Sequence, residues 1–227
     1  MSRDETTLKL TDIVRGEEAN NAENLRFVTN AGEIKCRLHP ALSGDAAILW
    51  VFGSGGGLGG PAGGVYERLA GQFQSLGVSS LQLDYRRPGY LRDCILDVLL
   101  GLDFLADQGK KRIVLVGHSF GGAVVITTGI ISDYVTAVAA LSSQTNGAEP
   151  VGSLTPKPLL LIHGTDDEIL PDSCSRRLYA EASEPKKLIL YENCRHGLDG
   201  CRAELDRDLT GWLTEILKIK ANSQSAV

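Results

Sequence analysis

The chain has 227 residues, of which 43% are hydrophobic and 22% are charged, and its formal net charge is −5. This length and composition are typical of one globular domain with a sizeable core. The net negative charge and the lack of any basic run interleaved with aromatic residues argue against a nucleic-acid partner. The first residues contain no apolar segment of the signal-peptide kind, and no stretch approaches the ~18 apolar residues of a membrane span. We therefore expect a cytoplasmic protein without a membrane contact.

Three segments are predicted along the chain: a loosely ordered lead-in over 1–24, one domain over 25–219 and a frayed tail over 220–227. The lead-in is polar and shows no sustained period of apolar residues. The domain begins with an antiparallel hairpin over 25–38, in which Asn30-Ala31-Gly32-Glu33 forms the turn.

Beyond the hairpin, predicted strands and helices alternate. The strands include continuous apolar runs, typical of strands covered on both faces, and the helices show apolar residues at helical spacing or end at a glycine. The predicted strands span 46–52, 78–84, 112–116, 135–141, 158–163 and 187–191, and the predicted helices span 64–75, 91–107, 123–131, 172–182 and 201–219. This alternation predicts an α/β domain with a mostly parallel central sheet and helices on both faces.

The sequence Gly117-His118-Ser119-Phe120-Gly121-Gly122 joins one of these strands to the helix that follows. Gly-x-Ser-x-Gly between a strand and a helix is the pattern of a nucleophile elbow, a tight turn that holds the serine hydroxyl above the sheet. Glycines fit at 117 and 121 because the turn has no room for larger side chains. Ser119 is therefore the predicted nucleophile, and it needs a base and an orienting acid from elsewhere in the chain.

The expected base is a histidine in a loop at the carboxyl end of a strand, where the catalytic groups of open α/β sheets collect. His196 meets this condition, because it lies in the polar loop after the last predicted strand. His39 precedes a proline near the hairpin, and His118 lies inside the elbow, where it cannot face the target of its neighbour. His163 ends a strand and opens the segment expected to carry the acid.

Three adjacent carboxylates, Asp166, Asp167 and Glu168, follow the strand 158–163. The chain order of serine, acid and histidine is the one known from the α/β-hydrolase fold. With these motifs, residues 45–218 resemble small α/β-hydrolases with one domain and no cap, a group that includes carboxylesterases and relatives of dienelactone hydrolase. The resemblance implies that Asp167 is the acid, because it is the aspartate of a His-Gly-x-x-Asp-x-x-x-Pro pattern. Asp166 is then a flanking turn residue.

An oxyanion hole needs backbone N–H groups that are preset where negative charge develops. Phe120, the residue after the nucleophile, is expected to supply one N–H, and the loop after the strand 46–52 is expected to supply the other. In similar proteins that loop usually reads His-Gly-x. Here Phe52 replaces the histidine, and Ser54 or Gly55 is the predicted donor.

The same loop, Gly55-Gly56-Gly57-Leu58-Gly59-Gly60, also fits the G-x-G-x-x-G pattern of a dinucleotide site, with Asp84 as the ribose partner. A run of glycines matches many patterns, however, and this interpretation leaves Ser119, Asp167 and His196 without a role. We therefore expect no nucleotide cofactor. No metal is expected, because no group of histidine, cysteine and carboxylate residues has ligand spacing.

About 15 residues separate the predicted strands 135–141 and 158–163, too few for a helical cap domain, so we expect an open site for a small ester. Arg86 and Arg87 follow a strand at the same edge and are candidates for binding an acidic substrate. A thioesterase or peptidase is the alternative within this fold. A non-catalytic module for small-molecule binding or signalling is the alternative of another class, and the complete set of serine, acid and histidine favours catalysis over it.

The five cysteines are odd in number and scattered, and none forms a C-x-x-C pair. We expect them to be reduced thiols, as is usual in a cytoplasmic protein. Cys194 lies two residues before His196, but nothing else in the sequence supports a redox role for it.

Overall fold

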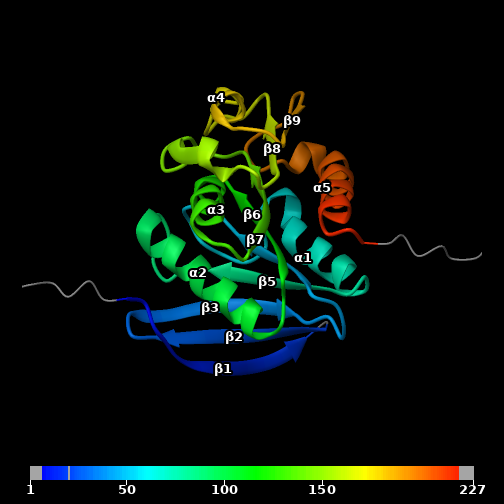
Figure 1. The fold of residues 1–227 in the computed structure, drawn as a ribbon. Helices are drawn as coiled ribbons and strands as arrows, with labels where there is room; N and C mark the ends of the chain where they lie inside the picture. Colours follow the sequence, from blue (N-terminus) through cyan, green and yellow to red (C-terminus); the bar gives the residue numbers. More distant parts are fainter. Residues whose placement is uncertain (1–6, 20, 220–227) are drawn as a thin grey trace, which may run out of the picture.

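The computed structural model of the protein describes residues 7–19 and 21–219 (Figure 1). Its described strands form one sheet in the order β1-β2-β3-β5-β4-β6-β7-β8-β9. At one end of the sheet β1 (Leu10–Ala19), β2 (Ala22–Thr29) and β3 (Gly32–His39) are antiparallel, and β3 pairs antiparallel with β5 (Val78–Asp84). The predicted hairpin is confirmed, with strands longer than expected.

The rest of the sheet is parallel. It runs from β5 through β4 and β6 to the far edge at β9, with every neighbouring pair in parallel register. The strands of this part are β4 (Ala46–Val51), β6 (Arg112–His118), β7 (Val135–Leu141), β8 (Leu159–Gly164) and β9 (Lys186–Tyr191). Every residue of β4 and β8 is buried, which explains why both read as continuous apolar runs.

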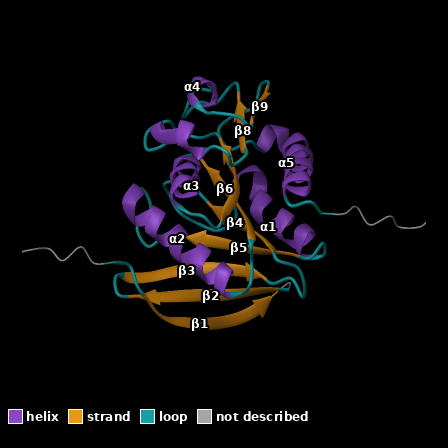
Figure 2. Ribbon diagram, in the orientation of Figure 1, coloured by secondary structure: helices purple, strands orange, loops and turns teal. Residues whose placement is uncertain are grey.

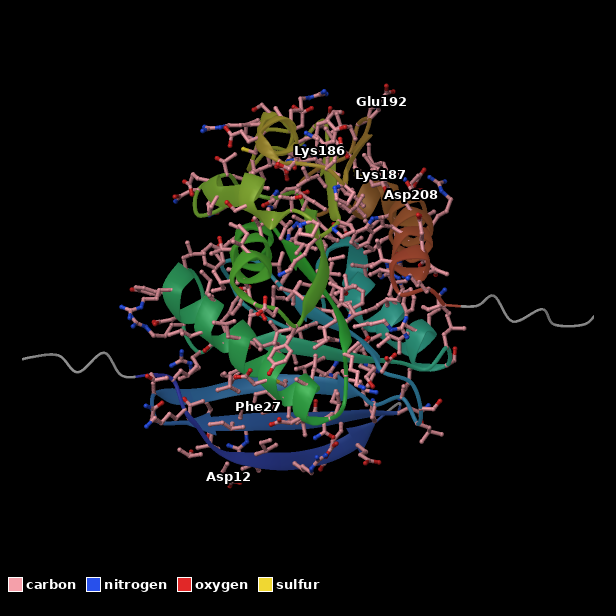
Figure 3. The ribbon with its side chains drawn as sticks, in the orientation of Figure 1. Asp12, Phe27, Lys186, Lys187, Glu192 and Asp208 are labelled. Atoms are coloured by element: carbon pink, nitrogen blue, oxygen red, sulfur yellow. A yellow bond between two sulfur atoms is a disulfide. The ribbon has the colours of Figure 1, made fainter. Side chains whose placement is uncertain are left out.

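Helices cover both faces of the sheet (Figure 2). One face packs against α1 (Pro61–Gln74) and α5 (Arg202–Ile216), which lie side by side. The other packs against α2 (Leu91–Asp107), α3 (Phe120–Ile131) and α4 (Ser173–Glu181). On this second face Phe27 of β2, labelled in Figure 3, packs against Phe104 of α2 with ring centroids 4.9 Å apart. The predicted α/β architecture is confirmed.

The prediction of a loosely ordered lead-in over 1–24 is corrected by the structure, because β1 and the start of β2 occupy most of this segment. The strand β1 pairs along its length with β2, for example Ile13 opposite Phe27. It is an edge strand, and its described side chains are exposed or only half-buried. Its sequence therefore lacks the apolar pattern by which a buried strand is predicted. Residues 1–6 and the predicted frayed tail at 220–227 lie outside the described residues.

Between β7 and β8 the chain forms only a short 3-10 helix, Glu149–Leu154, so the predicted absence of a helical cap at this point is confirmed. The carboxyl ends of the parallel strands are therefore covered there by loops. Among the helices that the structure describes, none combines the length and the apolar character needed to cross a membrane.

Candidate active site

Ser119 lies at the sharp turn between β6 and α3, with φ 58° and ψ −121°. A positive φ at a residue other than glycine is strained and persists only where the surroundings enforce it. Here the Ser119 N–H donates to the carbonyl of Leu141, at 2.8 Å, and its own carbonyl accepts from Gly122, at 3.0 Å. A Cβ on Gly117 would collide with the carbonyl of Gly121, and the elbow therefore requires a glycine there. The turn leaves Ser119 partly exposed at the carboxyl edge of the sheet.

Asp167 and His196 meet at the same edge, on loops that follow the neighbouring parallel strands β8 and β9. The Oδ2 of Asp167 lies 2.7 Å from Nδ1 of His196. Its Oδ1 accepts hydrogen bonds from the backbone N–H groups of Ile169, at 2.9 Å, and Leu170, at 2.7 Å. Asp166 is exposed, and its carboxylate accepts from the neighbouring Thr165 hydroxyl rather than from His196.

The side chain of Asp167 is fully buried, and burial alone would raise its pKa. The hydrogen bonds from Leu170, His196 and Ile169 outweigh burial and hold the pKa below its ordinary value. The carboxylate is therefore ionised at neutral pH and accepts a hydrogen bond from the Nδ1–H of His196. This fixes the tautomer of the imidazole and leaves Nε2 free to accept a proton.

His163 contacts the same carboxylate from the other side. It is fully buried, and its Nε2 lies 3.0 Å from Oδ2 of Asp167 and 3.0 Å from the carbonyl of Leu170. Because both neighbours of Nε2 are acceptors, Nε2 carries the hydrogen and Nδ1 accepts from the Ser175 hydroxyl at 2.7 Å. In the sequence, His163 is only the residue that opens the segment expected to carry the acid. Its contact with Asp167 arises because the loop after β8 folds back towards it.

His118 holds the loop of His196 against the elbow. Its Nε2 lies 2.9 Å from the carbonyl oxygen of His196, and the two rings are 4.8 Å apart between centroids. On its other side the ring stacks on Phe52 with a centroid distance of 5.3 Å. Burial lowers the pKa of His118 to about 4, so the ring is neutral and its Nε2–H donates to the carbonyl. The sequence gives no local sign of this contact, because His118 and His196 are 78 residues apart.

The glycine-rich loop after β4 lies against the nucleophile. A Cβ on Gly53 would be 3.4 Å from Cβ of Ser119, and the N–H of Gly56 donates to the carbonyl of Gly53 at 3.0 Å. Ser54 and Gly55 are the central residues of this turn, so its hydrogen bond does not use their N–H groups. The N–H of Phe120 is also unused within its helix, because the first turn of a helix has no acceptors for its donors. The predicted oxyanion donors thus belong to two segments that meet at Ser119.

Asp84, the residue that a dinucleotide site would use for the ribose, accepts a hydrogen bond from the N–H of Gly57 at 2.7 Å. A Cβ on Gly56 would lie 2.5 Å from the same carboxylate, so the loop closes directly over it. Asp84 therefore anchors the glycine-rich loop in its turn.

The two arginines after β5 differ in exposure. Arg86 is almost fully buried and forms an ion pair with the buried Asp97, so its guanidinium faces α2. Arg87 is exposed, pairs with Asp93 at 3.0 Å and lies over the ring of Tyr90, 4.1 Å from its centroid. Of the two, only Arg87 is placed to meet a substrate from solution.

Cys194 and Cys201 form a disulfide across the loop that carries His196. The expectation that all five cysteines are reduced is wrong for this pair, whereas Cys36, Cys94 and Cys174 are free. The two cysteines are seven residues apart in sequence, and the loop between them turns back on itself, which brings their Cα atoms within 6.1 Å. Their spacing carries no recognised motif.

A cavity of about 650 Å³ lies at the other end of the parallel strands, near the amino ends of β4 and β5. Pro40, Ser43 and Gln74 are among the residues that line it. Its position separates it from the loops around Ser119, so it is not part of the candidate active site.

No family model matches the chain. The uncharacterized protein YfhR of Escherichia coli strain K12 is 26% identical over 223 residues, which cover 82% of this chain and 77% of YfhR. An alpha-beta serine hydrolase homologue from Coxiella burnetii is 17% identical, with a TM-score of 0.73 over 87% of this chain and all of that one. The esterase domain of a Rhodothermus marinus protein is 20% identical, with a TM-score of 0.69 over 86% of this chain and 98% of that one. The chain therefore has the α/β-hydrolase fold, without a cap between β7 and β8.

Proposed function

We propose that the protein is a serine hydrolase that cleaves small carboxylic esters. The observation that carries the proposal is the strained backbone of Ser119 at the elbow, at an edge of the sheet where His196 and Asp167 are hydrogen-bonded to each other. Backbone strain at a serine is costly for a protein that only binds a ligand, whereas a nucleophile needs the exposed position that the turn provides. Structural neighbours that include an esterase domain support the same activity.

The proposed reaction has two halves. The Oγ of Ser119 attacks the ester carbonyl while Nε2 of His196 takes its proton, and Asp167 stabilises the resulting imidazolium. The negative charge that develops on the carbonyl oxygen is stabilised by the N–H of Phe120 and by that of Ser54 or Gly55. The alcohol leaves with the proton from His196. Water then attacks the acyl group on Ser119 with His196 again as the base, which releases the carboxylic acid.

The substrate class follows from the open edge of the sheet. The segment between β7 and β8 contains only the 3-10 helix Glu149–Leu154, so no helical cap there encloses a long acyl chain. Each buried methylene contributes about 0.8 kcal/mol to binding, and a site that buries few of them gains little from chain length. We therefore propose that short acyl groups are preferred.

The test is hydrolysis of p-nitrophenyl esters with acyl chains from C2 to C12 by the wild-type protein, Ser119→Ala and Ser153→Ala. Ser153 is an exposed serine of the short 3-10 helix and serves as the matched control. The proposal predicts hydrolysis of the short esters by wild type and Ser153→Ala and a loss of at least about 10³-fold for Ser119→Ala. Equal rates for Ser119→Ala and wild type would refute it.

A further inference from the structure

The loop that carries the proposed base, residues 192–201, is closed by the disulfide between Cys194 and Cys201. We refer to it as the base loop. It starts at Glu192, labelled in Figure 3 beyond the end of β9, and leads through a short 3-10 helix, Asp199–Cys201, into α5. His196 lies inside the ring that the disulfide closes, two residues after its first cysteine.

The two ends of the disulfide belong to different parts of the fold. At the first end the carbonyl of Cys194 accepts from the N–H of Asp166 at 3.0 Å, and a Cβ on Gly164 would collide with that carbonyl. Cys194 is thus packed directly on the loop that carries Asp167. At the second end Cys201 immediately precedes the first residue of α5. The disulfide therefore joins the part of the base loop that packs on the loop of Asp167 to the residue that precedes α5, with His196 between the two cysteines.

The base loop does not hold its shape by its own conformational preference. Asn193 has a positive φ of 55°, which asparagine adopts readily, whereas Leu198 has a positive φ of 58° that is strained for a leucine. Such a strained conformation persists only where surrounding contacts enforce it. The backbone N–H of His196 donates to an exposed carboxylate, that of Glu168, at 3.2 Å, a bond that solvent can replace. The carbonyl of His196 is also held by His118, at 2.9 Å, and that of Gly197 by the N–H of Ala62, at 2.7 Å. The disulfide adds the one covalent restraint on this segment among the described residues.

We propose that the Cys194–Cys201 disulfide is a positioning element for His196, so that its reduction lowers the turnover number of the enzyme. This inference rests on the hydrolase function proposed above. The sulfurs do not touch the reacting atoms. They act through the distance and angle between the His196 ring and Ser119, and a misplacement of about 1 Å can cost about 100-fold in rate.

The redox step requires a dithiol as reductant. One of its thiolates attacks a sulfur of the disulfide, the S–S bond breaks and a mixed disulfide forms. The second thiol of the reductant then displaces the protein sulfur, so the dithiol is oxidised to a disulfide and the protein gains two electrons and two protons as two thiols. Cys194 is 1% and Cys201 5% exposed, so reduction requires the base loop to open and is slow.

The fold has other contacts that keep α5 in place when the disulfide is reduced. The hydroxyl of Tyr191, at the end of β9, donates to Asp208 of α5 at 3.0 Å. Arg68 of α1 forms an ion pair with Asp206 of α5 at 2.8 Å. Reduced cysteines also behave as small hydrophobic side chains, which favours their remaining buried. Reduction is therefore expected to loosen the base loop without unfolding the domain.

The experiment compares oxidised wild-type protein, wild type reduced with dithiothreitol, the double variant Cys194→Ala/Cys201→Ala, and Cys174→Ala. Cys174 is a free and partly exposed cysteine, which makes it the matched control. The dithiol is removed by anaerobic desalting before the assay, and the mass of the intact protein reports the redox state. The readouts are kcat and KM for p-nitrophenyl acetate, the rate of labelling by a fluorophosphonate, and the near-UV circular dichroism.

The proposal predicts that reduced wild type and the double variant lose kcat by about tenfold or more, with KM within about twofold and with the spectrum of a folded protein. Labelling by the fluorophosphonate slows in parallel, and reoxidation restores the kcat of the reduced wild-type protein. Cys174→Ala has the same kcat as wild type when both are oxidised and when both are reduced. An unchanged kcat in reduced wild type and in the double variant would overturn the proposal, because it would show a purely structural disulfide. Ser119→Ala separates the two proposals: if oxidised Ser119→Ala is as active as wild type, the hydrolase assignment itself fails.

Discussion

His118 makes the stability of the protein depend on pH. Burial lowers its pKa in the folded state to about 4, against an ordinary value of about 6.5 in the unfolded chain. As the pH falls, the unfolded chain binds the proton first, so stability that is fully present above pH 6.5 is lost progressively towards pH 4. With these two values, the free energy of unfolding decreases by about 2 kcal/mol between pH 8 and pH 5, and by about 3 kcal/mol once the pH is well below 4.

The groups that face His118 shift its pKa in both directions, and burial outweighs those that raise it. The backbone hydrogen bond to His196 favours protonation, as does the charge of Asp167, whereas the rings of His196 and His163 oppose it. Burial is the largest of these effects, because the ring lies between Phe52 and the base loop.

Urea denaturation of wild type and His118→Gln at pH 8 and pH 5 measures this contribution. Glutamine keeps an N–H donor for the carbonyl of His196 but does not titrate. The variant should therefore lose about 2 kcal/mol less than wild type over this range. His39→Gln is the comparison, because burial lowers the pKa of His39 but Glu67 opposes that effect, so its removal should change the pH dependence less. An identical pH dependence for His118→Gln and wild type would refute the assignment of a neutral His118.

Four further outcomes are expected. Asp167→Asn should lower kcat/KM by up to about 10⁴-fold, because an amide does not hold the required tautomer of His196, whereas Asp166→Asn should stay within about threefold of wild type; the reverse order would move the acid. His196→Gln should be inactive in the steady-state ester assay, because an amide cannot accept the proton of Ser119; activity near that of wild type would remove His196 as the base. Gly121→Ala should destabilise the protein by more than about 2 kcal/mol in urea denaturation, since its Cβ would collide with the carbonyl of Phe52; an unaffected midpoint would contradict the elbow geometry. kcat/KM should be highest for acyl chains of roughly C2 to C6, and a steady rise to C12 with activation at an oil–water interface would show that a lid exists.

Local patterns made the sheet and the elbow predictable. Strands such as β4 and β8 are buried on both faces and therefore read as continuous apolar runs, while α2 shows its apolar residues at helical spacing. The elbow is equally local, because Gly117 and Gly121 are close to Ser119 in sequence and the steric demand that selects them arises within the turn.

Features that depend on distant contacts were not predictable. The edge strand β1 has no buried face, so its pairing with β2 leaves no apolar pattern. The burial of Arg86 depends on Asp97, which lies on the next helix. His118 meets the carbonyl of His196 across 78 residues of sequence, and this contact arises only when the loop after β9 folds back over the elbow.

The central claim is that Ser119 is a nucleophile activated by His196, and its most direct test is covalent labelling. The oxidised protein is treated with a fluorophosphonate, its intact mass is measured, and the labelled peptide is identified by fragmentation. We predict one phosphonyl adduct per chain on Ser119, no adduct on Ser119→Ala, and labelling slowed by about 10³-fold or more in His196→Gln. Labelling of another residue, or equal labelling of His196→Gln and wild type, would contradict the account.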